Sequence, residues 1–192
     1  MRRIKSKKGF TLVELLIGLV VFMLLAGAVS SVVVLGFSLY SRSAQRSAAQ
    51  QAGNTLCELL SSRLCYGVDV TVTNSLPIIE ENLADRQMTC IVIPESGDRV
   101  SLGSAIPAQT DVLGENALSG MRVYARISEL SAKKNPVLEI EVEICSESDG
   151  RTVYSTLETV RLMNHRAGDI VLPEGETSNR NGDLYIGFAD IG

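Results

Sequence analysis

The sequence predicts an α+β protein, in which one long N-terminal α-helix packs through its second half on an antiparallel β-sheet. Three patterns predict it: an apolar segment over residues 10–37, an amphipathic segment over 38–66, and alternating strand patterns over 67–192. A short basic segment, residues 1–9, precedes them. The chain therefore divides into a leader, a membrane-spanning helix, its amphipathic continuation and a β-rich domain.

The apolar segment is long enough to cross a membrane. It reads FTLVELLIGLVVFMLLAGAVSSVVVLGF, 28 residues with one charge and no proline. As a helix it would be about 42 Å long, whereas a bilayer core needs roughly 20 residues. The next basic residue is Arg42, and the basic residues before the segment are Arg2, Arg3, Lys5, Lys7 and Lys8. This asymmetry predicts a single pass through the cytoplasmic membrane, with a cytoplasmic N-terminus and an extracytoplasmic domain.

Two ordinary explanations of this segment fit less well. A secretory signal peptide has an apolar core of about 7 to 15 residues, which is shorter than this one. A plain signal anchor gives no reason for Glu14 within the apolar run. A carboxylate deep in the bilayer costs about 2.5 to 3.5 kcal/mol unless it lies near the surface or is paired. Glu14 therefore indicates a partner.

Residues 7–16, KKGFTLVELL, resemble the processing motif of type IV pilins and of the pseudopilins of type II secretion and competence systems. The resemblance implies cleavage by a prepilin peptidase between Gly9 and Phe10, N-methylation of Phe10, and a role for Glu14 in assembly. It also implies a pilin-like lollipop fold. Partners would be the peptidase, other pilin or pseudopilin subunits, a membrane assembly platform and the lipid bilayer.

The spacing of these residues has a physical reason of its own. Gly9 offers a protease an unhindered backbone. Cleavage would leave an ammonium on Phe10, and Glu14 lies four residues further, on the same face of a helix. In a growing bundle Glu14 could compensate the Phe10 amine of a neighbour, because an unpaired charge is costly in an apolar setting.

The amphipathic segment continues the helix towards the folded domain. Its leucines recur at helical spacing and would face that domain, and Gly53-Asn54 is expected to mark an irregularity. The stripe consists of Leu56, Leu59, Leu60 and Leu64.

Five strand patterns follow, VDVTV, TCIVI, MRVYARISEL, VLEIEVEI and TVYSTLETVRLM, with a terminal LYIGF strand. In the fourth, the apolar residues would face the helix and the glutamates water. SESDG, residues 146–150, is expected to form a hairpin turn. Arg122 and Arg126 are expected to pair across strands with Glu139, Glu141 and Glu143.

Two stretches, residues 94–120 and 173–183, show little periodicity and are expected to be long loops with a role in recognition. In the second, Asn179, Asn181 and Asp183 alternate, with Glu174 and Glu176 nearby, as in a calcium loop. The full EF-hand spacing is missing, so we expect solvated turn residues, no metal and no cofactor.

Cys57, Cys65, Cys90 and Cys145 form an even set in an extracytoplasmic domain, which predicts disulfides. Cys57 and Cys65 would be about 12 Å apart along a helix, too far to bond each other. Each would need Cys90 or Cys145. The alternative is that all four are free thiols that pack as small hydrophobes.

Charge and composition exclude several functions. After the leader, 13 basic and 22 acidic residues give a net charge near −9, which disfavours nucleic-acid binding. The single histidine, His165, belongs to no recognisable catalytic set, so we do not expect an enzyme.

These features lead to the hypothesis that the chain is a structural subunit of a type IV pilus, type II secretion or competence filament. The alternative is a membrane-anchored extracytoplasmic binding protein that does not polymerise. Many major pilins carry a proline in the apolar helix, whereas this chain has AGAVSSVVV there. The resemblance therefore favours a minor pilin or pseudopilin, which after processing would lie in an extracytoplasmic filament or at the cell surface.

Overall fold

The computed structural model describes residues 11–80, 88–104, 109–131, 136–163 and 177–189. The chain divides into two compact units, Met1–Ala44 and Gln45–Gly192, and one helix belongs to both. The predicted leader, Gly9, Phe10 and His165 lie outside the described residues. So do Glu174 and Glu176 of the loop that resembles a calcium site.

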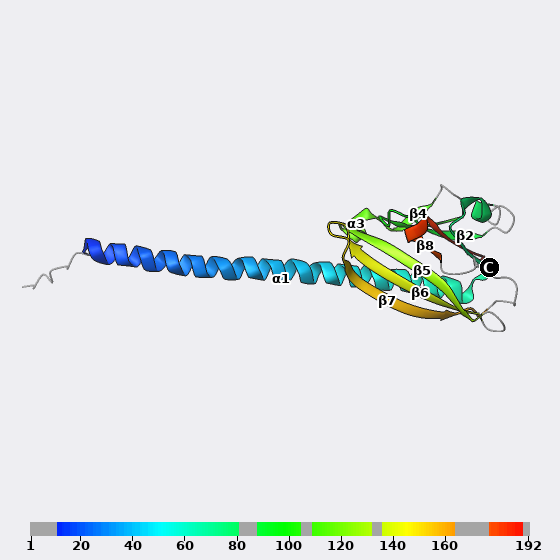
Figure 1. Ribbon diagram of the computed structural model, residues 1–192, viewed down its shortest axis with the longest axis horizontal. Coiled ribbons are helices and arrows are strands. Elements are labelled where there is room, and N and C mark those ends of the chain that lie inside the picture. Colours follow the sequence, from blue (N-terminus) through cyan, green and yellow to red (C-terminus); the bar gives the residue numbers. More distant parts are fainter. Residues whose placement is uncertain (1–10, 81–87, 105–108, 132–135, 164–176, 190–192) are drawn as a thin grey trace, which may run out of the picture. The chain divides into compact units, whose positions relative to one another are not determined.

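Helix α1 runs without a break from Leu12 to Tyr66, which confirms the predicted long helix (Figure 1). Among the described residues it is the one helix long and apolar enough to cross a membrane. The hydroxyls of Ser30 and Ser31 donate to the carbonyls of Ala26 and Ala28, at 2.8 and 2.7 Å. The two serines therefore do not leave unpaired hydroxyls in the apolar segment.

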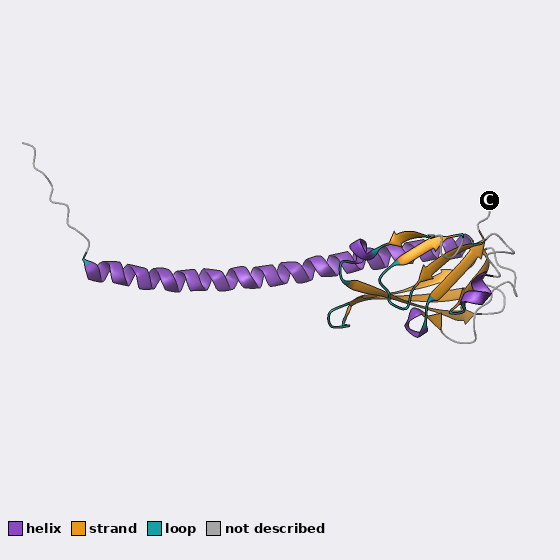
Figure 2. Ribbon diagram, turned by 90° about the horizontal axis from the view of Figure 1, so that it is seen from above, coloured by secondary structure: helices purple, strands orange, loops and turns teal. Residues whose placement is uncertain are grey.

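The β-rich unit contains two antiparallel sheets where the sequence predicted one (Figure 2). Sheet A has the strand order β1-β9-β2-β3-β4, and sheet B has the order β7-β6-β5-β8. Sheet A is formed by β1 (Val68–Thr73), β2 (Thr89–Ile93), β3 (Val100–Gly103), β4 (Thr110–Leu113) and β9 (Leu184–Ala189). Sheet B is formed by β5 (Met121–Ser131), β6 (Val137–Ser146), β7 (Thr152–Arg161) and β8 (Thr177–Ser178).

All six predicted strands are present, as β1, β2, β5, β6, β7 and β9. The prediction of a long loop over residues 94–120 was wrong, because this stretch contains β3, β4 and the short helix α3 (Glu115–Leu118). Both strands have only four residues, too few to show a clear period. The second predicted loop contains β8 and the 3-10 helix η1 (Asn179–Asn181).

One core joins the C-terminal part of α1 to the inner faces of both sheets. Alternation along β6 is as predicted, because Leu138, Ile140, Val142 and Ile144 are fully buried and the glutamates between them are partly exposed. The predicted leucine stripe of α1 is buried apart from Leu59, which packs at the margin. The buried helix residues are Ala49, Ala52, Gly53, Leu56, Cys57, Leu60 and Leu64.

Gly53 permits a close contact between α1 and β7. The expected irregularity at Gly53-Asn54 was wrong, since α1 is continuous there. A Cβ atom at Gly53 would lie 2.7 Å from Cδ1 of Tyr154, and the Tyr154 hydroxyl donates to Oδ1 of Asn54 at 2.8 Å. The glycine is therefore explained by the tyrosine ring that lies against it, because any side chain would displace this ring.

We expect Gly53→Val to destabilise the domain by about 1–3 kcal/mol, because the added methyl groups overlap the Tyr154 ring. Thermal unfolding of the purified chain measures the change. Gln50→Val, at an exposed position of the same helix, is the matched control. Equal shifts in the two variants would show that the contact with Tyr154 does not explain Gly53.

Candidate assembly site at the helix N-terminus

Thr11 and Glu14 form a capping box at the start of α1. The backbone N–H and the hydroxyl of Thr11 each donate to Oε2 of Glu14 at 3.1 Å. The backbone N–H of Glu14 donates in return to the Thr11 hydroxyl at 3.3 Å. Since α1 begins at Leu12, Thr11 is the N-cap and Glu14 the third helical residue, the positions that this motif requires.

The capping box gives Glu14 a role within its own chain. A carboxylate in the first turn is favoured by the helix dipole, and an N-cap hydrogen bond typically contributes about 0.5–2 kcal/mol. The predicted partner of Glu14, the Phe10 amine, lies outside the described residues. This cap was not among the predictions from the sequence, although T-x-x-E before an apolar run is its known signature.

The surface of α1 that follows Glu14 is apolar on all sides. The large hydrophobic side chains between Leu12 and Tyr40 are about half to four-fifths exposed in the isolated chain. A Cβ atom at Gly18, Gly27 or Gly36 would meet nothing within 4 Å, so no contact among the described residues explains these glycines. A surface of this size is unstable in water and needs lipid or other helices around it.

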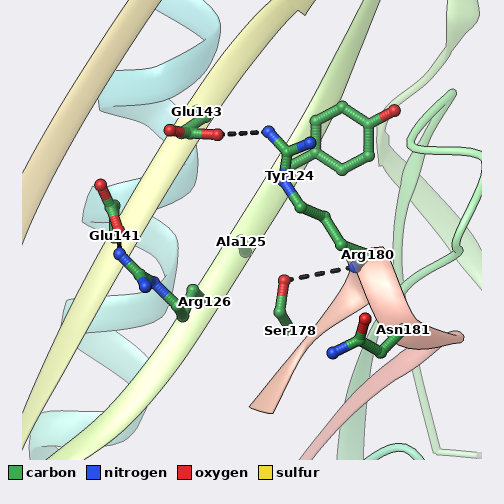
Figure 3. Close-up of a pocket in the computed structure, with 8 residues that line it drawn as sticks. All are labelled: Tyr124, Ala125, Arg126, Glu141, Glu143, Ser178, Arg180 and Asn181. Atoms are coloured by element: carbon green, nitrogen blue, oxygen red, sulfur yellow. Dashed lines mark hydrogen bonds and ion pairs between the residues drawn. The ribbon is translucent and has the colours of Figure 1, made fainter. Parts of the chain in front are cut away.

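Sheet B carries a ladder of ion pairs on its outer face (Figure 3). Arg126 pairs with Glu141, as predicted from the strand register. The predicted pairing of Arg122 was wrong in its partner, because Arg122 lies opposite Cys145 and pairs with Glu147 at 3.1 Å. Glu143 forms an ion pair with Arg180 of η1.

Asn179 is a buried structural residue and not the solvated turn residue that we expected. Its Oδ1 accepts from the backbone N–H of Ala125 at 2.8 Å. Its Nδ2 donates to the carbonyls of Pro94 and Val123, at 3.0 Å each. This amide therefore ties the two predicted loops to β5, and its oxygen is not available to a calcium ion.

Asp183 is likewise engaged by the protein, while Asn181 is exposed. Asp183 accepts from the backbone N–H of Glu95 at 2.9 Å and from the Tyr185 hydroxyl at 3.2 Å. Burial, and then the nearby Asp183 carboxylate, raises the pKa of Tyr185 to about 12. Within the described parts of the chain, no group of three or more His, Cys, Asp or Glu side chains could hold a metal.

All four cysteines lie in the described residues and are free thiols, so the expected disulfides are not present in the structure. Cys57 and Cys65 are both helical, as assumed. Cys57 lies in the main core, whereas Cys90 packs in a separate cluster with Ile79 and Tyr185. The structure therefore corresponds to the alternative, in which the thiols pack as small hydrophobes.

Burial makes two of these thiols poor nucleophiles. It raises the pKa of Cys90 to about 12, and burial together with the Glu158 carboxylate raises the pKa of Cys57 to about 11. Both remain protonated at neutral pH, and only the thiolate reacts readily.

We expect an alkylating reagent at pH 7.5 to modify neither Cys57 nor Cys90 in the folded chain, and to modify both after denaturation. Peptide mass spectrometry measures the labelling. The partly exposed Cys65 serves as the internal reference. Labelling of Cys57 or Cys90 as fast in the folded as in the denatured chain would contradict the burial described.

A known protein family matches the N-terminal part of the chain. Residues 4–30 match the family described as the prokaryotic N-terminal methylation motif. No curated protein matches the chain at a significant level. The matched residues include Gly9, Phe10, Thr11 and Glu14.

Two similar solved structures are the PilB minor pilin from Streptococcus sanguinis and its D319A mutant. The first is 9% identical with a TM-score of 0.49, over 77% of this chain and 35% of that chain. The mutant is 11% identical with a TM-score of 0.46, over 79% and 34%. This chain thus spans about a third of their length, and TM-scores below 0.5 do not establish a common fold. The N-terminal match is the firmer finding: residues 4–30 of this chain carry the prokaryotic N-terminal methylation motif.

Proposed function

We propose that this protein is a structural subunit, a minor pilin or pseudopilin, of a type IV pilus, type II secretion or competence filament. The observation that carries the proposal is a single carboxylate, Glu14, at the start of a helix whose next seven turns are apolar and exposed. It lies in the matched motif, four residues after Phe10. An anchor alone would need the apolar helix and a capping residue, which a glutamine could also provide, but it would not need the charge of Glu14.

The capping box suggests how the precursor tolerates Glu14 before assembly. Two hydrogen bonds from Thr11 to the carboxylate lower the cost of placing this charge at the membrane surface. A carboxylate has about four lone-pair sites, so Oε2 can keep the cap while Oε1 remains able to accept another donor. Glu14 can therefore bind a neighbour's amine without losing its own helix cap.

Processing would create that amine. In this proposal a prepilin peptidase cuts between Gly9 and Phe10, Phe10 is N-methylated, and its ammonium pairs with Glu14 of an adjacent subunit. The apolar helices then pack together, with the assembly platform moving subunits out of the bilayer. The basic residues before Gly9 would keep the uncut N-terminus in the cytoplasm.

The variants Glu14→Gln and Thr11→Val separate the two roles of Glu14. Glutamine can still cap the helix but carries no charge, whereas Thr11→Val removes the capping hydroxyl and keeps the carboxylate. We expect Glu14→Gln to be inserted and cleaved but to lose at least nine-tenths of its assembly, because the amine of the neighbour is left unpaired. Thr11→Val should retain most of its assembly.

Sheared-filament yield, or cross-linking between α1 helices, measures assembly in the native host. Glu14→Ala, which removes cap and charge together, should be no better than Glu14→Gln. Wild-type assembly by Glu14→Gln would refute the ion pair and leave only the capping role. A wild-type chain that never cross-links to another subunit would instead favour the alternative, an anchored binding protein that does not polymerise.

A further inference from the structure

A polar pocket lies on the outer face of sheet B (Figure 3). It has a volume of about 390 Å³ and lies between β5, β6 and the β8-η1 segment. This is within the usual range for small-ligand sites, about 300–1,000 Å³. Its lining includes two arginines, Arg126 and Arg180, and two glutamates, Glu141 and Glu143.

The charges of the pocket cancel in pairs. Arg126 is bound to Glu141 and Arg180 to Glu143. An anionic ligand would have to displace a glutamate, and a cationic ligand would have to displace an arginine. A hydroxyl group need not displace either side chain, because it can donate to a carboxylate and accept from a guanidinium at the same time. Such paired bonds also strengthen each other.

Arg180 is held in place before any ligand arrives. Its guanidinium lies 4.2 Å from the centroid of the Tyr124 ring, and its backbone N–H donates to Oγ of Ser178 at 3.2 Å. The adjacent Asn179 anchors η1 to β5 through the buried bonds described above. A ligand would therefore lose little affinity to the ordering of this side chain.

We propose that this pocket binds a neutral saccharide unit of one or two rings, whose hydroxyls bridge the two Arg–Glu pairs. Ser178 and the exposed Asn181 line the pocket and offer further polar contacts. The pocket does not depend on cleavage or on Glu14, so saccharide binding can be tested independently of the assembly role.

The test uses the full chain in a zwitterionic detergent without a sugar head group. Lactose, maltose and N,N′-diacetylchitobiose are the probes, and saturation-transfer NMR with titration measures binding. We expect binding of at least one probe. Arg126→Gln and Glu141→Gln should each weaken it about tenfold or more, as expected for a lost hydrogen bond to a charged group.

Arg122→Gln is the matched control, because Arg122 lies on the same strand and face but pairs with Glu147 outside the pocket. It should bind as wild type does. Arg180→Gln would remove the ion pair between η1 and Glu143, so a second variant, Arg180→Lys, is used at this position. Thermal unfolding checks that each variant is folded. Absence of binding by all three saccharides, equal weakening by Arg122→Gln, or displacement of the saccharide by acetate would each overturn the proposal.

Discussion

The structure depends on a single helix that must satisfy two different surroundings. Its first buried residue is Ala49, and the described parts of the chain leave the large side chains up to Tyr40 exposed. From Ala49 to Leu64 the same helix is part of the core of the β-rich unit. Because helix continuity satisfies the backbone polar groups throughout, α1 can pass from apolar surroundings to a protein core without a break.

In the β-rich unit, a few specific contacts determine how neighbouring elements pack, which short apolar patterns in the sequence do not predict. Gly53 lets the Tyr154 ring lie against α1, and the tyrosine hydroxyl closes on Asn54. Asn179 joins the loop at Pro94 to β5 through three hydrogen bonds. Its Oδ1 accepts one hydrogen bond and its Nδ2 donates two, so a side chain that only donates or only accepts would leave a buried group unpaired.

Sequence periodicity predicted the parts of the fold with many residues in phase. The long helix, six strands, the inner face of β6 and the Arg126–Glu141 pair all follow from periods of 3.6 and 2. The strands β3 and β4 have only four residues each, which is too short for an alternating pattern to be recognised in the sequence. Arg122 pairs with Glu147, which lies in the turn after β6, where strand periodicity does not predict the position of a side chain. Asn179 is buried because segments that are distant in the sequence meet around it.

The candidate site was predictable in a different way. Gly9, Phe10 and Glu14 were predicted from a motif, and residues 4–30 match that family, while the roles assigned to these three residues stay predictions. The capping partner Thr11 could have been predicted as well, because T-x-x-E before an apolar run is the signature of a capping box. The cysteines show the converse limit, since an even count says nothing about whether the thiols face one another.

In the proposed function, this chain is processed to a mature subunit that starts at Phe10. Intact mass and N-terminal peptide mass of the chain isolated from membranes, with and without the cognate prepilin peptidase, measure this processing. We expect the peptidase to remove residues 1–9 and the new N-terminal Phe10 to be methylated. A chain that keeps residues 1–9 in the presence of the active peptidase would contradict it.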